Sequence, residues 1–137
     1  MQQVKAMKRK QDKAVNEAQS AEDELLAIVV AALEDVKALD IRVIDVRDMT
    51  SITDRMVIAS GTSTRHVKAV ADNVALEAKK AGVQAPGMEG EKGAEWILID
   101  LGDVVVHVMM PEVREFYALE KLWSVGGEQR PAADAER

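Results

Sequence analysis

The chain has 137 residues, of which 47% are hydrophobic and 31% are charged, which is the composition of one globular domain and not of a disordered segment. It contains no cysteine, which excludes disulfides, thiolate catalysis and cysteine-ligated metal sites. Only His66 and His107 are present, so a metal site would depend on carboxylates. There is no apolar run near about 18 residues and no signal-peptide pattern, so we expect a cytoplasmic protein without membrane contact.

The net charge of −6 is distributed unevenly along the chain. Residues 1–20 carry a net charge of +3, so the rest of the chain carries −9. A body this acidic binds nucleic-acid phosphates poorly and complements a basic protein surface, so we expect no direct sequence-specific binding of nucleic acid. Residues 1–20 are predicted to form a helical or flexible extension, and a basic arm that touches RNA is the alternative.

The first long amphipathic pattern begins at Ser20. Ser20 and Asp23 form an S-x-x-D capping pattern, and the acidic residues at 22–24 suit the positive end of a helix. Apolar residues then recur at steps of three and four as far as Leu39. The pattern predicts a helix from Ser20 to about Leu39 with an ordinary core face.

Two short strands are predicted next, at residues 40–46 and 55–60, with a polar loop at 47–54 between them. Both faces of the first strand carry branched apolar residues. This pattern is typical of a strand in the centre of a sheet.

The second strand runs into Gly61-Thr62-Ser63, which opens a helix that ends at Gly82. The helix is predicted to bury a stripe of small residues, namely Val67, Val70, Ala71, Val74 and Ala78. Backbone N–H groups and hydroxyls at such a junction can cradle a phosphate, but the P-loop pattern and its lysine are absent. The other interpretation is an ordinary turn in which Thr62 or Ser63 is the N-cap.

Residues 83–95 form a glycine-rich connection, with a short strand predicted near residues 83–85. Its glycines recur at every third position among acidic residues, in the order Gly87, Glu89, Gly90, Glu91 and Gly93. The spacing is not G-x-G-x-x-G and no helix follows, which argues against a dinucleotide site. The segment is interpreted as a mobile loop.

Two apolar runs, at residues 96–101 and 104–110, flank Gly102-Asp103. Glycine at the first central position of a two-residue turn is typical of type II′, so the sequence predicts a β-hairpin with Leu101 opposite Val104. One face of this hairpin is wholly aliphatic and is predicted to be core: Ile97, Ile99, Val106, Val108 and Met110.

The other face of the hairpin is mixed. It contains three predicted cross-strand pairs: Trp96 with Met109, Leu98 with His107, and Asp100 with Val105. A tryptophan, a methionine and a carboxylate side by side suit a surface that another element or another protein covers.

A final helix is predicted to begin at Pro111 and to continue at helical spacing to Trp123. The hairpin and this helix hold all the large aromatic side chains of the chain, namely Trp96, Phe116, Tyr117 and Trp123. These side chains are therefore expected to anchor packing or binding. Residues 125–137 are predicted to be a flexible tail, which leaves a domain at residues 21–124.

Candidate groups for chemistry are few. Asp100 and Asp103 could chelate Mg²⁺, but they lie on opposite sides of a tight turn, where aspartates are usually just solvated. His107 is a single strand histidine with no serine or cysteine nucleophile to pair with. We therefore predict no catalytic residue, no metal and no cofactor.

The predicted order is helix, strand, strand, helix, short strand, hairpin and helix. Strands linked by a hairpin must be antiparallel, whereas strands linked through a helix can be parallel. The sequence therefore predicts an α/β fold in which a mixed β-sheet is sandwiched with α-helices.

Several runs of the chain are specific in sequence, namely VIASGTSTRHV (57–67) with ADNV (71–74), WILIDLGDVVVHV (96–108) and PEVREFYALEKLW (111–123). In this order, they resemble the ribosomal silencing factor family, also called the Iojap or YbeB family. The resemblance covers about residues 22–124 and leaves the extension and the tail outside. The chain departs from it at Asp54-Arg55-Met56, where the family often has Asp-Tyr-Phe, and at Met109, where many members have Phe.

The resemblance implies a nucleotidyltransferase-like fold without nucleotidyltransferase activity. It also implies binding to the large ribosomal subunit, through its conserved fourteenth protein at the subunit-joining face. Such binding would block docking of the small subunit and repress translation under nutrient limitation. The mixed hairpin face is the expected docking surface, with Trp96, Leu98, Leu101 and Met109 as apolar anchors and Asp100, Asp103, Glu89 and Glu91 as partners of basic groups.

Two alternatives stay open. One is a nucleotide-binding or nucleotidyltransferase enzyme that uses the Gly61-Thr62-Ser63 loop with Asp100 and Asp103. The other is a homodimer that forms through the mixed face and must open before it binds the ribosome.

Overall fold

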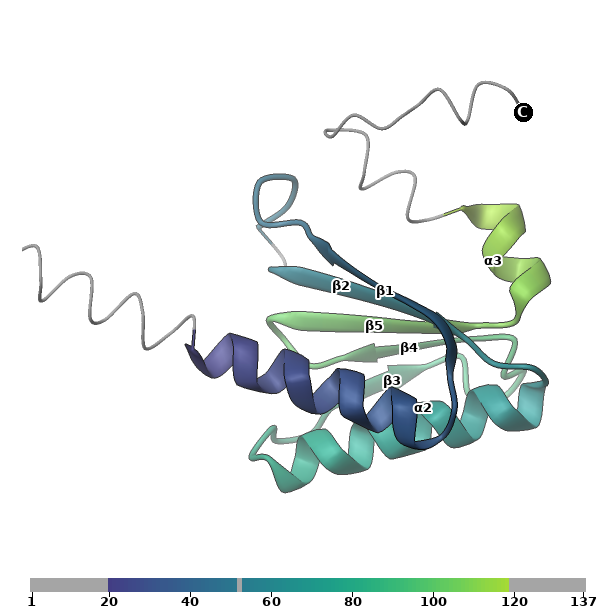
Figure 1. Cartoon of the computed structure of the whole chain (residues 1–137), viewed down its shortest axis with the longest axis horizontal. Coiled ribbons are helices and arrows are strands. Elements are labelled where there is room, and N and C mark those ends of the chain that lie inside the picture. The colour runs from purple at the N-terminus through teal and green to yellow at the C-terminus, as the bar shows by residue number, and fades with distance from the viewer. Residues whose placement is uncertain (1–19, 52, 119–137) are drawn as a thin grey trace, which may run out of the picture.

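The structure is a computed structural model that describes residues 20–51 and 53–118 (Figure 1). A helix covers residues 20–35 of the described part. The elements that follow are β1 (Leu39–Asp45), β2 (Arg55–Ser60), α2 (Thr64–Lys80), β3 (Gly87–Glu89), β4 (Trp96–Asp100), β5 (Val104–Met109) and α3 (Pro111–Tyr117). Within the described ranges, no helix is long and apolar enough to cross a membrane.

The five strands form one mixed sheet in the order β1-β2-β5-β4-β3. β2 and β5 are parallel, and the other neighbouring pairs are antiparallel. The predicted hairpin register is confirmed, since Trp96 pairs with Met109, Leu98 with His107 and Asp100 with Val105. Leu101 N–H donates to the carbonyl of Val104 across the turn, and Gly102 has the positive φ (+91°) that such a turn requires.

The two longer helices cover the same face of the sheet, as Figure 1 shows. Their buried side chains form one core with the aliphatic face of the β4–β5 hairpin. Every member of the predicted α2 stripe is buried: Val67, Val70, Ala71, Val74 and Ala78. Small side chains on this stripe let the α2 backbone lie close to the strands.

The opposite face of the sheet holds a smaller cluster of Val46, Met56, Ile58 and Met109. Val113 from the short helix α3 packs against it, together with half-buried Ile44 and Trp96. Arg114 fixes α3 on this face, because its buried guanidinium donates to Ser60 Oγ at 2.9 Å. We call this side of the sheet the open face, since the two longer helices leave it uncovered.

The first helix ends earlier than predicted. It is already helical at Ser20, the first described residue, and Glu22 and Asp23 after it pair with Arg55. The helix ends before Leu39 because Lys37 is left-handed (φ +60°). The Lys37 and Ala38 N–H groups donate to the carbonyls of Glu34 and Leu33, which is a Schellman motif built without glycine.

β1 is an edge strand, so the prediction of a central strand was wrong. It pairs only with β2 among the described strands, and a bulge interrupts its register between Leu39 and Arg42. Most of its residues are exposed, Val43 included. The branched residues on its two faces reflect β-propensity and not burial on both sides.

The short strand predicted near residues 83–85 lies at Gly87–Glu89 instead. Val83 N–H donates to the carbonyl of Ala78 and so closes the end of α2, and Ala85 has φ +50°, which no strand accepts. α3 ends at Ala118, which is left-handed (φ +48°). The rest of the predicted final helix, including Leu119, Leu122 and Trp123, lies outside the described residues.

The connection after β3, which the sequence analysis interpreted as a mobile loop, contains a tight turn at Gly90. Gly90 has φ +95°, and a Cβ at this position would lie 2.1 Å from the carbonyl oxygen of Trp96. Ala94 N–H donates to the Gly90 carbonyl across the turn. Only glycine can combine this positive φ with the absence of a Cβ that would clash with Trp96. Gly90 therefore fixes where β4 begins.

We predict that Gly90→Ala lowers the free energy of unfolding by about 3 kcal/mol, because it combines a left-handed backbone with a backbone clash. Gly93→Ala is the matched control, since a Cβ there meets nothing within 4 Å. It should change stability by less than about 0.5 kcal/mol. Urea denaturation measures both, and equal stabilities for the two variants would contradict this account of the turn.

Candidate functional site

Three aromatic side chains form a row at one end of the open face. The ring centroids of Trp96 and Tyr117 are 4.9 Å apart, and those of Tyr117 and Phe116 are 5.0 Å apart with planes at 87°. Trp96 is half-buried, whereas Tyr117 is 52% exposed and Phe116 is 80% exposed. We call these three residues the aromatic row. Such large apolar surface in contact with solvent is typical of a binding site.

The Trp96 side chain is held in place by His107 on β5. Its indole Nε1–H donates to His107 Nδ1 at 2.9 Å, and the two ring centroids are 5.9 Å apart. His107 is only 7% exposed, and burial lowers the pKa of its imidazole to about 4. The ring is therefore neutral at pH 7, which leaves Nδ1 free to accept.

Polar and apolar side chains continue from the aromatic row along the open face. Leu98 is half-buried next to Trp96 on β4, and Asp100 is exposed at the end of the same strand. β3 brings Glu89 beside Leu98, because these two residues are partners in the sheet. Glu89 is exposed, as is Glu91 in the following turn. Together these residues give the apolar surface an acidic border.

Two of the predicted anchors do not lie on this accessible surface. Met109 has the predicted orientation but is 0% exposed, because it belongs to the cluster against which Trp96 and Val113 pack. Leu101 is 7% exposed and packs in the main core, because it shares the parity of Ile97 and Ile99 and so faces the longer helices. Met109 supports Trp96 from inside the protein, and neither residue is available as a contact.

Phe116 and Tyr117 are members of the site that the sequence reasoning did not assign to it. The clustering of aromatic residues in this part of the chain was the available signal. The sequence predicted a helix that continues past both residues to Trp123, but α3 ends at Tyr117, with left-handed Ala118 as its C-cap. The Tyr117 ring lies against Trp96, and the Phe116 ring lies against Tyr117 and is mostly exposed to solvent.

The Gly61-Thr62-Ser63 junction is an internally bonded turn. Ser63 is the N-cap of α2, and its Oγ accepts from His66 N–H, as one interpretation predicted. Thr62 N–H donates to His66 Nδ1 at 2.8 Å, and His66 Nε2 lies 2.6 Å from the carbonyl oxygen of Val36. His66 thereby joins the start of α2 to the end of the first helix. A Cβ on Gly61 would lie 2.8 Å from Val67, so the junction is also sterically tight.

The two hairpin aspartates also have structural roles. Asp100 Oδ1 accepts from Gly102 N–H at 2.9 Å and so stabilises the turn. The backbone carbonyl of Asp103 accepts from both Asp54 and Arg55 N–H, which ties the hairpin turn to the start of β2. In the described part of the chain, no three His, Cys, Asp or Glu side chains form a group that could hold a metal ion.

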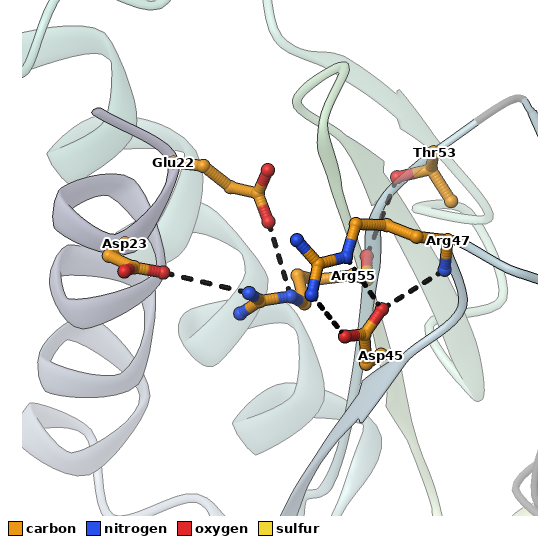
Figure 2. A network of polar contacts seen from close by, with 6 residues as sticks. All are labelled: Glu22, Asp23, Asp45, Arg47, Thr53 and Arg55. Carbon is orange, nitrogen blue, oxygen red and sulfur yellow. Dashed lines mark hydrogen bonds and ion pairs between the residues drawn. The ribbon is translucent and has the colours of Figure 1, made fainter. Parts of the chain in front are cut away.

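A polar network at the start of β2 joins the first helix to the sheet (Figure 2). Arg55 Nε lies 3.1 Å from Glu22 Oε2, and both side chains are largely buried, while Arg55 Nη2 lies 3.6 Å from Asp23 Oδ1. Burial raises the pKa of Glu22. Nearby, hydrogen bonds from Arg47 lower the pKa of Asp45 to about 2. Arg55, one of the two departures from the family pattern, is thus an ion-pair residue and not an apolar packing residue.

The low pKa of His107 predicts a pH dependence of stability. The unfolded chain takes up a proton near pH 6.5, whereas the folded chain takes it up only near pH 4. The contribution of His107 to the free energy of unfolding is therefore complete above pH 6.5. It is lost as the pH falls toward 4, by up to about 3 kcal/mol. Urea denaturation of the wild type and of His107→Asn at several pH values tests this. If the free energy of unfolding changes equally with pH in the two proteins between pH 6.5 and 4, the prediction is wrong.

Comparison with known proteins connects this chain to a family. A family model described as "Ribosomal silencing factor during starvation" matches residues 18–137. The ribosomal silencing factor RsfS of Chromobacterium violaceum is 47% identical over 109 residues, which are 80% of this chain and 87% of that protein. RsfS of Bacillus subtilis is 39% identical over 112 residues, which are 82% of this chain and 92% of that protein.

The fold is also found among solved structures. A crystal structure of a Chromobacterium violaceum protein superposes with a TM-score of 0.73 at 46% identity, and the match covers 80% of this chain and 89% of that one. A mouse relative, 39% identical over 101 residues that are 72% of this chain and 44% of that protein, is named "Mitochondrial assembly of ribosomal large subunit protein 1". The family match over most of the chain confirms the resemblance seen in the sequence, and the chain belongs to the ribosomal silencing factor family.

Proposed function

We propose that this chain binds the large ribosomal subunit, prevents the small subunit from joining it and so represses translation when nutrients are limited. It acts in the cytoplasm as a binding protein with no chemistry of its own, on a fold like that of the nucleotidyltransferases. Family membership and the names of the relatives support this function. The proposed contact on the subunit is its conserved fourteenth protein, at the face where the small subunit docks.

The observation that carries the proposal is the exposed aromatic row beside an acidic border. Tryptophan and tyrosine are enriched among residues that dominate binding energy, and they act best in the centre of an interface from which water is excluded. Trp96 and Tyr117 would occupy this centre, with Phe116 and Leu98 next to them. Asp100, Glu89 and Glu91 would meet basic groups on the partner, which the negative charge of the body favours. Asp103, the other predicted partner of basic groups, lies in the hairpin turn and lines a hollow with Leu25 and Leu101 on the helix side of the sheet.

The enzymatic alternative receives less support. Thr62 and Ser63 are bonded to His66, Gly61 N–H donates to the carbonyl of Met109, and Asp100 accepts from Gly102. Calorimetry with ATP and Mg²⁺ tests this alternative directly. Saturable binding with turnover would favour an enzyme over a docking protein.

We predict that Trp96→Ala weakens binding to purified large subunits by more than tenfold, because loss of a central tryptophan anchor costs about 2 kcal/mol or more. Leu76→Ala is the matched control, since Leu76 is 50% exposed on α2, on the other side of the sheet. Sedimentation of large subunits through sucrose with each variant measures the bound fraction. Affinity for Trp96→Ala equal to that of the control would remove the aromatic row from the site.

The same gradients, repeated with small subunits added, test the blocking of subunit association. Wild-type protein should keep the two subunits apart, and Trp96→Ala should let them join at the same concentration. Because Trp96 is half-buried, thermal unfolding of each variant is measured in parallel. Phe116→Ala removes a ring that is 80% exposed, so it tests the aromatic row with little effect on the fold.

A further inference from the structure

The hydrogen bond between Trp96 and His107 determines the protonation state that the buried histidine must have. An indole N–H can only donate, so Nδ1 of His107 must present a lone pair to it. This requires the neutral imidazole with its proton on Nε2, because an imidazolium donates from both nitrogens. Trp96 in turn contacts Tyr117, which contacts Phe116. A continuous series of ring contacts therefore leads from a buried acceptor to the most exposed ring of the surface.

Burial maintains the neutral form of His107 at physiological pH. Desolvation is the cause of its low pKa. Charged and titratable side chains on the same side of the sheet include Asp40 and Arg42 on β1, which pair with each other, Glu89 on β3, Asp100 on β4, and Arg114, which also pairs with Asp40, and Tyr117 on α3. Of these, Arg114 is engaged by Ser60 and Asp100 by the turn at Gly102, while Tyr117 is separated from the imidazole by the Trp96 ring that it contacts.

We propose that His107 is a positioning residue of the docking surface, whose unprotonated Nδ1 fixes the orientation of the Trp96 indole and, through it, of Tyr117. This inference rests on the proposed function, since it treats the aromatic row as the docking site. A ring held in one orientation before binding loses less conformational entropy on docking. His107 therefore contributes to affinity without touching the partner.

Two substitutions distinguish the role of His107 Nδ1 as a hydrogen-bond acceptor from the role of its ring in filling space. His107→Leu fills the buried space without an acceptor, whereas His107→Asn places an amide oxygen close to the position of Nδ1. With ¹⁵N-labelled tryptophan in a Trp123→Phe background, Trp96 gives the single indole N–H signal. We expect this N–H to be protected from solvent exchange in the wild type, to exchange about tenfold faster in His107→Leu, and to recover protection in His107→Asn.

Binding to large subunits should follow the same order. Loss of one neutral hydrogen bond predicts about three- to tenfold weaker binding for His107→Leu, with His107→Asn close to the wild type. If His107→Leu binds as tightly as the wild type while Trp96→Ala is weakened, the positioning role is wrong and the docking site stands. If Trp96→Ala also binds normally, the docking site itself is wrong.

The wild-type protein gives a second measurement that does not depend on whether His107→Leu folds. The Trp96 indole signal should shift as the imidazole titrates, at a pH well below 6.5, and this shift should be absent in His107→Asn. If the Trp96 indole signal of the wild type does not shift during this titration, the proposal is wrong.

Discussion

Burial of one aliphatic face of the sheet beneath two helices is the interaction on which the rest of the structure depends. Ile97, Ile99, Val106 and Val108 are fully buried and form the centre of this core. Side chains alternate along a strand, so burying these four commits their neighbours Trp96, Leu98 and Asp100 to the opposite side. A one-residue slip in register would exchange the two sets. The composition of the open face is thus a consequence of how the core is packed.

The aromatic row is held by contacts that converge from several elements. The tight turn at Gly90 sets the start of β4, and the bond from Arg114 to Ser60 fixes α3 on the sheet. α3 then carries Tyr117 onto the indole of Trp96. Phe116, which precedes Tyr117 on α3 and contacts its ring, remains 80% exposed. At the other end of the sheet, the ion pair of Arg55 with Glu22 holds the first helix over the core. The site is therefore built on rigid elements, which suits precise docking.

The features that local chemistry determines could be predicted from the sequence. The hairpin register follows from the Gly102-Asp103 turn and the alternation on either side of it, and the α2 stripe follows from its helical spacing. The edge position of β1 could not be predicted, because it depends on which distant strands pair. The end of the first helix was missed because Lys37 takes a conformation that usually marks glycine.

The difference between local sequence patterns and tertiary contacts also explains which residues of the site were predicted correctly. Trp96, Leu98, Asp100, Glu89 and Glu91 lie where hairpin parity places them, at least partly accessible. Met109 has the right parity but is covered by α3, a tertiary contact that no local pattern encodes. Leu101 was predicted as an apolar anchor of the docking surface, although its parity with Ile99 directs it into the main core. Phe116 and Tyr117 belong to the site because α3 packs on the open face and brings Tyr117 against Trp96, which is again a tertiary contact.

The central claim is that a partner on the large subunit covers the aromatic row. Hydroxyl-radical footprinting of the free protein and of the protein bound to large subunits tests it most directly, because aromatic side chains react strongly when exposed. The account predicts that Trp96, Tyr117 and Phe116 become protected in the complex, while Leu76 on α2 stays as reactive as in the free protein. Protection of Leu76 with an unchanged aromatic row would contradict it.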